Sequence, residues 1–334
     1  MNGASLGRGE VPMLQFPIAV TALGALALVT TAVSAQVYEN QRVVEDPQQF
    51  DPARSAQDGD IVVTAPRTEK ERRKELREMV KTIIRKPRRG RPIETFYDPP
   101  CTEVLGLPEK FATAIEAGIG RNVQELGIDS DLAKAPCVPN VIVVFVSPEA
   151  GPADAWFDRG SGYLAHLQPY ERARVLNEKG PVRAWSHSVM RSANGPRLPD
   201  ADGMEAAGGS QIFNPVFSPG RLRSAISMEL ARSAIFIEVT SAAGKSIDQL
   251  SDYITMRAFA NLDGIDPGEM LAAPTILTLF ADQDPPAQLT EFDRAFLTEL
   301  YSMPLDEFEH RQYSLIASQV AEAERETASV PRRE

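Results

Sequence analysis

Histidine side chains are the commonest metal ligands in proteins and frequent acid–base catalysts near neutral pH. The chain has 334 residues and three histidines, which are His166, His187 and His310. Hydrolysis at zinc needs two histidines one helical turn apart and a carboxylate that takes a proton from bound water. No two of these histidines have that spacing, and we expect the three on different elements. The sequence therefore predicts no metal site, with a site assembled from distant elements left as the alternative.

Motifs for nucleophiles and cofactors are also missing from the sequence. Gly160-Ser161-Gly162 lacks the outer glycine of the G-x-S-x-G motif, and Gly209-Ser210 fits a flexible loop. There is no G-x-x-x-x-G-K-[ST] phosphate loop, no G-x-G-x-x-G motif after a strand and no C-x-x-C pair. We therefore expect no cofactor, and we favour a protein without enzymatic activity over a hydrolase with an unrecognised active site.

The N-terminal region has the features of an export signal. Residues 13–35 are almost continuously apolar and end in Val33-Ser34-Ala35, with small residues at the two positions that a signal peptidase reads. We expect a signal peptide over residues 1–35, cleaved between Ala35 and Gln36, and hence a protein of the periplasm or cell envelope with no retained transmembrane helix. The alternative is a retained anchor, because the apolar run approaches the roughly 20 residues that span a bilayer.

The two cysteines, Cys101 and Cys137, lie in the part expected to be exported. An oxidising compartment favours a disulfide between them, and the bond would stabilise the fold by roughly 4 kcal/mol at most through loop closure. Two unrelated thiols are the alternative. With no histidine nearby, the pair does not match a zinc site.

Residues 36–66 are polar and contain proline, which predicts a disordered leader. The segment D-I-V-V-T-A-P-R, residues 60–67, resembles the TonB-box-like segment near the mature N-terminus of many outer-membrane receptors. The resemblance implies an accessory role in TonB-dependent transport, in which this segment adds an edge strand to a partner's sheet. A chance match, or pairing of the segment within its own domain, is the interpretation we favour.

Residues 67–92 carry 12 lysine and arginine residues against four glutamates, so this segment has a charge of +8 in a chain whose net charge is −11. Apolar residues at helical spacing predict a basic amphipathic linker helix that stops before Pro87. The stripe consists of Leu76, Met79, Val80, Ile83 and Ile84. With residues 60–92, the protein could contact an anionic membrane surface or an unknown envelope protein, or the stripe could pack on the folded domain. Export makes nucleic acid an unsuitable partner.

Residues 93–303 are expected to form an α+β domain with a twisted mixed sheet and flanking helices. Pro108 opens a helix that ends near Gly127, and V-I-V-V-F-V at residues 141–146 predicts a strand buried on both faces. Residues 181–190 alternate as a strand does, and we interpret residues 226–239 as a hairpin.

Two capping boxes predict helices in the second half of this domain. Ser246 and Gln249 open a helix over residues 246–262, and Thr290 and Asp293 open another. A C-terminal helix is expected at residues 304–326, and residues 327–334 should form a disordered tail.

The segment T-I-L at residues 275–277, the pattern L-T-x-x-D at residues 289–293 and L-Y at residues 300–301 are similar to the tail of zincin-like metalloproteases, including the DUF2927 type of bacterial proteins. The helix that carries the H-E-x-x-H or H-E-x-x-Q residues in those proteins reads Q-L-S-D-Y here, at residues 249–253. The chain is also similar to uncharacterised exported bacterial proteins that share C-x-P-N-x-x-V-x-F-V and G-P-V-R-A-W. These resemblances imply a degenerate zincin-like fold from which no metal ligand can be carried over.

We therefore expect a non-catalytic exported protein that binds another envelope component. In active relatives the helix at residues 246–262 lines the cleft, so Asp252, Tyr253 and Arg257 are candidates for a binding cleft. The interpretation we favour is a buried or half-buried polar network that anchors this helix to the sheet.

Overall fold

The structure is a computed structural model of the chain. It describes residues 68–85, 91–128, 137–157, 162–165, 167–193, 195–198 and 223–329. The expected signal peptide with its cleavage site at Ala35 and Gln36, the leader and the TonB-box-like segment lie outside these residues, as does His166. Within them, no helix has the length and apolar character that crossing a bilayer requires.

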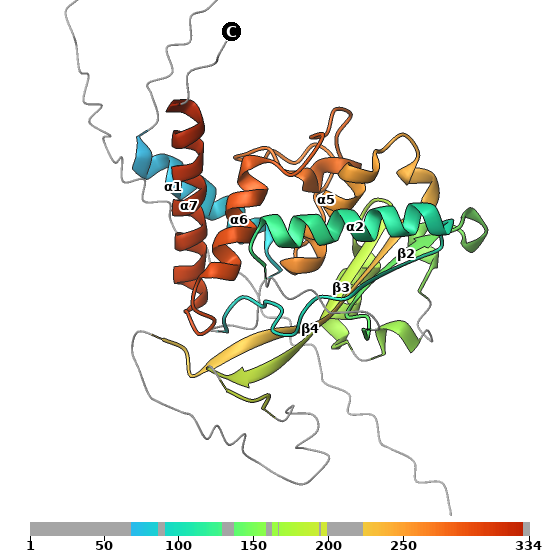
Figure 1. The fold of residues 1–334 in the computed structure, drawn as a ribbon, viewed down its shortest axis with the longest axis horizontal. Coiled ribbons are helices and arrows are strands. Elements are labelled where there is room, and N and C mark those ends of the chain that lie inside the picture. The colour runs from blue at the N-terminus through green and yellow to red at the C-terminus, as the bar shows by residue number, and fades with distance from the viewer. Residues whose placement is uncertain are drawn as a thin grey trace, which may run out of the picture. The chain divides into compact units, whose positions relative to one another are not determined.

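A four-stranded mixed sheet forms the centre of the described part (Figure 1). Its strands are β1 (Thr102–Leu105), β2 (Val141–Val146), β3 (Val182–Ser192) and β4 (Ile226–Glu238). They lie in the order β1-β2-β4-β3, with the first three parallel and β3 antiparallel at the edge. The expected α+β class with a mixed sheet and flanking helices is confirmed.

Six α-helices accompany this sheet in the described residues. They are α1 (Glu69–Ile83), α2 (Glu109–Glu125), α3 (Pro169–Asn177), α5 (Ile247–Phe259), α6 (Glu291–Ser302) and α7 (Glu309–Ser329). Helices α2 and α5 pack against each other on one face of the sheet, and α7 lies beside α1 and α6 (Figure 1). The main core therefore includes side chains from α1 and α7 as well as from the α+β domain.

The predicted hairpin at residues 226–239 is wrong, because the structure has one long strand there. The outer half of β4 pairs with β3, whereas its inner half, from Ser233 to Glu238, lies between β2 and β3. The outer half therefore alternates in character, and residues 234–237 of the inner half are continuously apolar. Two different environments along one strand produced the pattern of two strands.

Strand β2 was correctly predicted, but its burial on both faces was not. Val141, Val143 and Phe145 are buried under the helices, while Ile142 and Val144 on the opposite face are only half-buried. We call this opposite side the outer face of the sheet. A smaller apolar cluster covers its β3 end and contains Phe157, Leu164, Leu167, Val175, Trp185 and Ala234.

The disulfide between Cys101 and Cys137 is present, with a Cα–Cα distance of 6.2 Å. It joins the starts of β1 and β2, because a short strand that sequence reasoning missed follows Cys101 directly. The Cys101 amide donates to Asn140 Oδ1 at 2.7 Å, and its carbonyl accepts from the Val141 amide at 3.0 Å. The bond and these contacts together hold the two strand entrances in register.

The helix predictions from the capping boxes are confirmed. The side chains of Ser246 and Thr290 accept hydrogen bonds from the backbone amides of Gln249 and Asp293. In return, the side chains of Gln249 and Asp293 accept from the backbone amides of Ser246 and Thr290. The C-terminal helix differs from expectation at both ends. It starts at Glu309 and reaches Ser329, so the first residues of the expected tail are helical.

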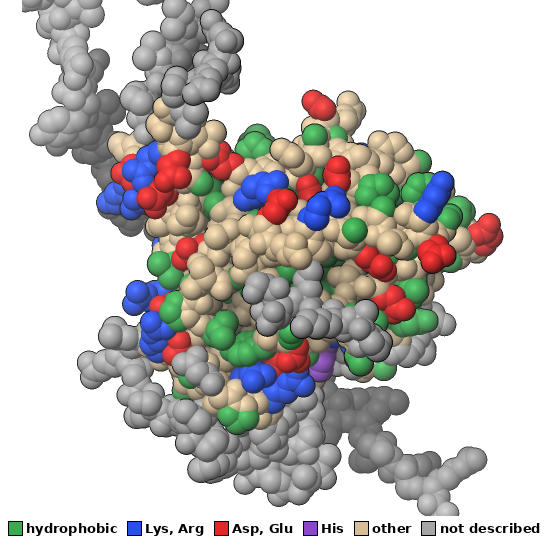
Figure 2. Space-filling view, viewed as in Figure 1, with side chains coloured by type: hydrophobic (Ala, Val, Ile, Leu, Met, Phe, Trp, Pro, Cys, Tyr) green, Lys and Arg blue, Asp and Glu red, His purple; other side chains and the backbone are tan. Residues whose placement is uncertain are grey.

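The basic segment forms a helix over Glu69–Ile83, and its apolar stripe is buried against α7. Six basic and four acidic residues lie in α1 itself, so the helix carries +2. Arg73 pairs with Glu69, and Lys81 pairs with Glu78 at 2.8 Å. Positive and negative side chains accordingly mix on the surface where α1 and α7 lie (Figure 2).

Candidate functional site

Helix α5, the element expected to line a cleft, is partly exposed in its first turn and enclosed by other structure from Leu250 onward. Every residue from Ser251 to Ala260 is buried, because the sheet, α2 and the start of α6 enclose the helix. Four of these buried residues are strongly polar, namely Ser251, Asp252, Thr255 and Arg257. Buried polar groups destabilise a fold unless they find partners, so their partners define what the helix does.

Asp252 connects α5 to two neighbouring helices. Its Oδ1 atom accepts a hydrogen bond from Asn122 Nδ2 on α2 at 2.7 Å. Its Oδ2 atom accepts from the Leu289 amide, just before α6, at 2.6 Å. Asn122 also donates to Thr255 Oγ1 at 3.0 Å, so the carboxylate is part of a closed polar network.

Arg257 points in another direction, into a buried group of charges. Its guanidinium pairs with Glu178, the residue after α3, and donates to the Leu262 carbonyl at 2.9 Å. The Arg257 side chain is 0% exposed and that of Glu178 is 8% exposed. Burial alone would lower the pKa of Arg257, but the charge of Glu178 outweighs it and raises that pKa above its ordinary value.

Glu178 also holds a second buried arginine. Arg85, which follows α1, lies 3.6 Å from the Glu178 carboxylate and donates from Nε to Asp263 at 2.9 Å. The other carboxylate contact is the Ala184 amide on β3, at 3.2 Å. Gly264 approaches so closely that a Cβ there would lie 2.6 Å from Glu178 Oε1. One carboxylate thus ties α1, α5 and the edge strand together.

Tyr253 is directed to a third neighbour. Its ring packs edge-to-face on Phe280, with the ring centroids 4.9 Å apart, and burial raises the pKa of its hydroxyl to about 12. The three residues predicted for a cleft therefore have three separate sets of partners. Asp252 and Arg257 do not contact each other: Asp252 links α5 to α2 and to the start of α6, whereas Arg257 links α5 through Glu178 to β3.

A small polar cavity lies beside the Arg85 end of this charge group. Its volume is about 30 Å³, enough for one water molecule, and Arg85, Arg174, Trp185 and Asn261 are among its lining residues. Asn261 has φ = 43°, the left-handed region that asparagine tolerates better than most residues. Its side-chain nitrogen, Nδ2, donates a hydrogen bond to Glu94 Oε2.

Glu94, whose carboxylate accepts this hydrogen bond, has a raised pKa. Burial raises the pKa of its carboxyl group, and hydrogen bonds with Ser188 and Asn261 offset the rise only in part. A carboxyl group with a raised pKa can act as a general acid. Sequence reasoning missed Glu94 and Glu178, because no local motif surrounds either residue.

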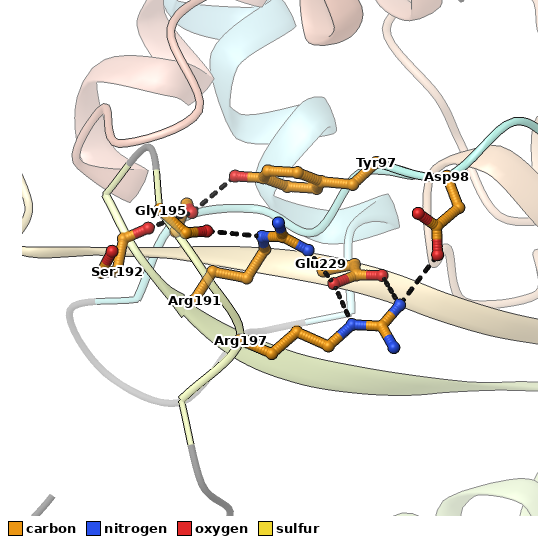
Figure 3. Close-up of polar contacts among 8 residues, drawn as sticks. Tyr97, Asp98, Arg191, Ser192, Gly195, Arg197 and Glu229 are labelled. Atoms are coloured by element: carbon orange, nitrogen blue, oxygen red, sulfur yellow. Dashed lines mark hydrogen bonds and ion pairs between the residues drawn. The ribbon is translucent and has the colours of Figure 1, made fainter.

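A second buried carboxylate lies at the far end of the β3–β4 ribbon (Figure 3). Glu229 of β4 is 0% exposed. It accepts from Arg191 Nη1 at 2.7 Å and from Arg197 Nε at 2.7 Å, and Arg197 Nη2 also donates to it. Arg191 of β3 and Arg197, which follows β3, are thereby fixed on β4.

The segment that precedes β1 completes this group (Figure 3). Asp98 accepts from Arg197 Nη2 at 2.9 Å, and the Arg191 guanidinium lies 4.4 Å from the centre of the Tyr97 ring. The Tyr97 hydroxyl donates to Ser227 Oγ at 2.5 Å. The group contains two arginines and two carboxylates, so its charges balance. Because these contacts hold β3, β4 and the segment before β1 together, we call the group the Glu229 clamp.

The pKa of Glu229 reflects this clamp. Burial raises the pKa of the carboxyl group, but the hydrogen bonds from Arg197 and Arg191 outweigh burial and hold the pKa below its ordinary value. An acid with a lowered pKa in the folded state stabilises the fold above its unfolded pKa. That contribution disappears as the pH falls through the folded pKa.

A Glu229→Gln variant is therefore expected to unfold about 2 kcal/mol more readily than the wild type at pH 7. The difference should shrink as the pH falls below about 4.5, because the unfolded wild-type chain then takes up a proton at this carboxylate, and it should vanish once the pH has passed below the lowered pKa of the folded carboxyl group. Urea unfolding at pH 7 and pH 3.5 measures both values. The exposed Glu103 provides the control as Glu103→Gln, and an unchanged difference at the two pH values would contradict the clamp.

The histidines do not come together in the described residues. His187 is on β3 and His310 is at the start of α7, and no group of three histidine, cysteine, aspartate or glutamate side chains there is arranged to hold a metal ion. A scan of protein-family models, a search of curated proteins and a search of solved structures each found no match to this chain.

Proposed function

We propose that this protein is a non-catalytic binding protein of the periplasm or cell envelope, built on a degenerate zincin-like scaffold. The ion pair between Arg257 and Glu178 carries the proposal. It places a fully buried salt bridge on the helix that would present catalytic groups to a cleft in an active relative. The polar residues of α5 then serve to hold the fold together.

The arrangement around α5 supports the zincin-like scaffold. Gln249 Nε2 donates to the Pro286 carbonyl at 3.0 Å, and Asp252 accepts from the Leu289 amide. The tail segment with its capping residues thus packs against α5, as the resemblance of the tail implies. An antiparallel strand, β3, lies at the edge of the sheet beside this helix.

The disulfide supports export. A bond between Cys101 and Cys137 persists in an oxidising compartment and is rare in a reducing one. It agrees with the signal peptide that the sequence predicts before Gln36.

The test combines metal analysis of the purified exported protein with a screen of peptidase and ester substrates. We expect less than stoichiometric zinc and no turnover above a buffer blank. A matched zinc-loaded metalloprotease serves as the positive control for both measurements. Stoichiometric zinc that is lost in His166→Ala or His187→Ala would overturn the proposal.

Glu94 favours a hydrolase as the second candidate function, because burial raises the pKa of its carboxyl group and it accepts a hydrogen bond from Asn261, which lines the small polar cavity. The same screen separates the two candidates. Turnover that disappears in Glu94→Gln, in a variant that still unfolds cooperatively, would support the hydrolase.

A further inference from the structure

A pocket of about 290 Å³ opens on the outer face of the sheet, across β3 and β4. The described residues that line it are Trp185, His187, Arg232 and Ala234. Trp185 is opposite Ala234 in the strand register, and His187 is opposite Arg232. Two adjacent cross-strand pairs therefore place an aromatic wall and a cation side by side on the same face. The volume is close to the lower end of the range for small-molecule sites.

Aromatic neighbours hold the ring of Trp185 in place. Trp185 is 6% exposed, stacks on Phe236 at 5.1 Å and contacts Phe157 edge-on at 5.3 Å. Because these neighbours fix its ring, a ligand would meet a preformed apolar surface. Such preorganisation lowers the free energy that binding must spend on ordering the site.

Arg232 differs from the arginines of the two buried groups. It is exposed, and its guanidinium makes no hydrogen bond or ion pair with the residues that the structure describes. Arg191, Arg197, Arg85 and Arg257 all have carboxylate partners. The guanidinium of Arg232 is thus available to donate two parallel hydrogen bonds to a planar anion.

We propose that this pocket binds a ligand in which a carboxylate is joined to an aromatic or bulky aliphatic group. The carboxylate pairs with Arg232, and the apolar group lies against Trp185 and Ala234. His187 lies on the carboxylate side of the pocket, opposite Arg232. The proposal rests on the proposed binding function and names a site for it.

The experiment uses 4-phenylbutyrate as the probe, with 4-phenylbutyramide and acetate as comparisons. The indole N–H signal of Trp185 is followed by nuclear magnetic resonance in the purified protein, and Trp156, the other tryptophan, provides an internal reference. We expect saturable movement of the Trp185 signal with 4-phenylbutyrate. The amide lacks the charge and acetate lacks the ring, so each should bind at least tenfold more weakly.

Arg232→Gln should weaken 4-phenylbutyrate binding at least tenfold, to the level of the amide. Arg121→Gln is the matched control, because Arg121 is an exposed arginine of α2 that pairs with Asp248, and affinity should stay within twofold. The proposed binding site would be contradicted by equal binding of the three probes, by no response of Trp185, or by full affinity in Arg232→Gln. Zinc-dependent turnover in the earlier screen would overturn the proposed function and leave this binding measurement standing.

Discussion

A Glu178→Gln variant is expected to unfold about 3–5 kcal/mol more readily than the wild type, because it leaves two buried arginines without their shared carboxylate. Arg257 is 0% exposed and Arg85 is 7% exposed, so solvent cannot replace the lost charge. The loss should be visible as a lower urea midpoint with an unchanged dependence on urea concentration. This is the largest effect that we expect from any single substitution in the protein.

An exposed ion pair provides the control for this variant. Lys179 pairs with Asp266 beside Glu178, but their side chains are 71% and 50% exposed. Asp266→Asn should therefore cost less than about 1 kcal/mol. A triple variant that replaces Arg85, Glu178 and Arg257 by apolar residues of similar volume should recover much of the stability. If Glu178→Gln costs no more than Asp266→Asn, the buried group does not hold the fold.

The second large effect is expected on removal of the disulfide. Cys101 and Cys137 are 36 positions apart, and the chain-entropy model assigns roughly 4 kcal/mol to a loop of that length. A Cys101→Ser, Cys137→Ser variant should lose about 2–4 kcal/mol, because its unfolded chain regains the freedom that the bond removes. Urea unfolding of the oxidised wild type and of the variant gives the difference.

A reducing agent separates the bond from the substitutions themselves. It should lower the stability of the wild type to that of the double serine variant, and it should leave the variant unchanged. Equal stability of the oxidised wild type and the variant would contradict the prediction. It would show that the disulfide adds no stability to that provided by strand pairing.

Features that arise from neighbours in the chain were predictable. The capping boxes at Ser246 and Thr290 each depend on two residues three positions apart, so they identified the starts of α5 and α6 from sequence alone. The cysteine pair and the strand at residues 141–146 also follow from local pattern and compartment. Residue propensity and spacing are sufficient to predict an element whose structure depends mainly on its own residues.

Features that arise between distant segments were not predictable. Arg257 is 79 positions from Glu178, and Glu94 is 167 positions from Asn261, so no spacing rule connects them. Asp252 and Arg257 were selected as cleft residues because they are polar on a helix. Whether such residues face solvent or the interior depends on what covers the helix, and here α2 and the start of α6 cover it.

Strand β4 also has a consequence for how the protein opens. Its inner half has a strand on each side, whereas its outer half is supported by β3 and by one short stretch at Thr95, which donates to the Met228 carbonyl at 3.3 Å and accepts from the Leu230 amide at 2.8 Å. Amide hydrogens of the outer half should exchange through local opening, and those of the inner half through global unfolding. Arg232 is the last residue before this boundary, and a register shift on β3 lies beside it, between His187 and Ser188. A ligand held at Arg232 would span both halves and slow the opening of the outer one.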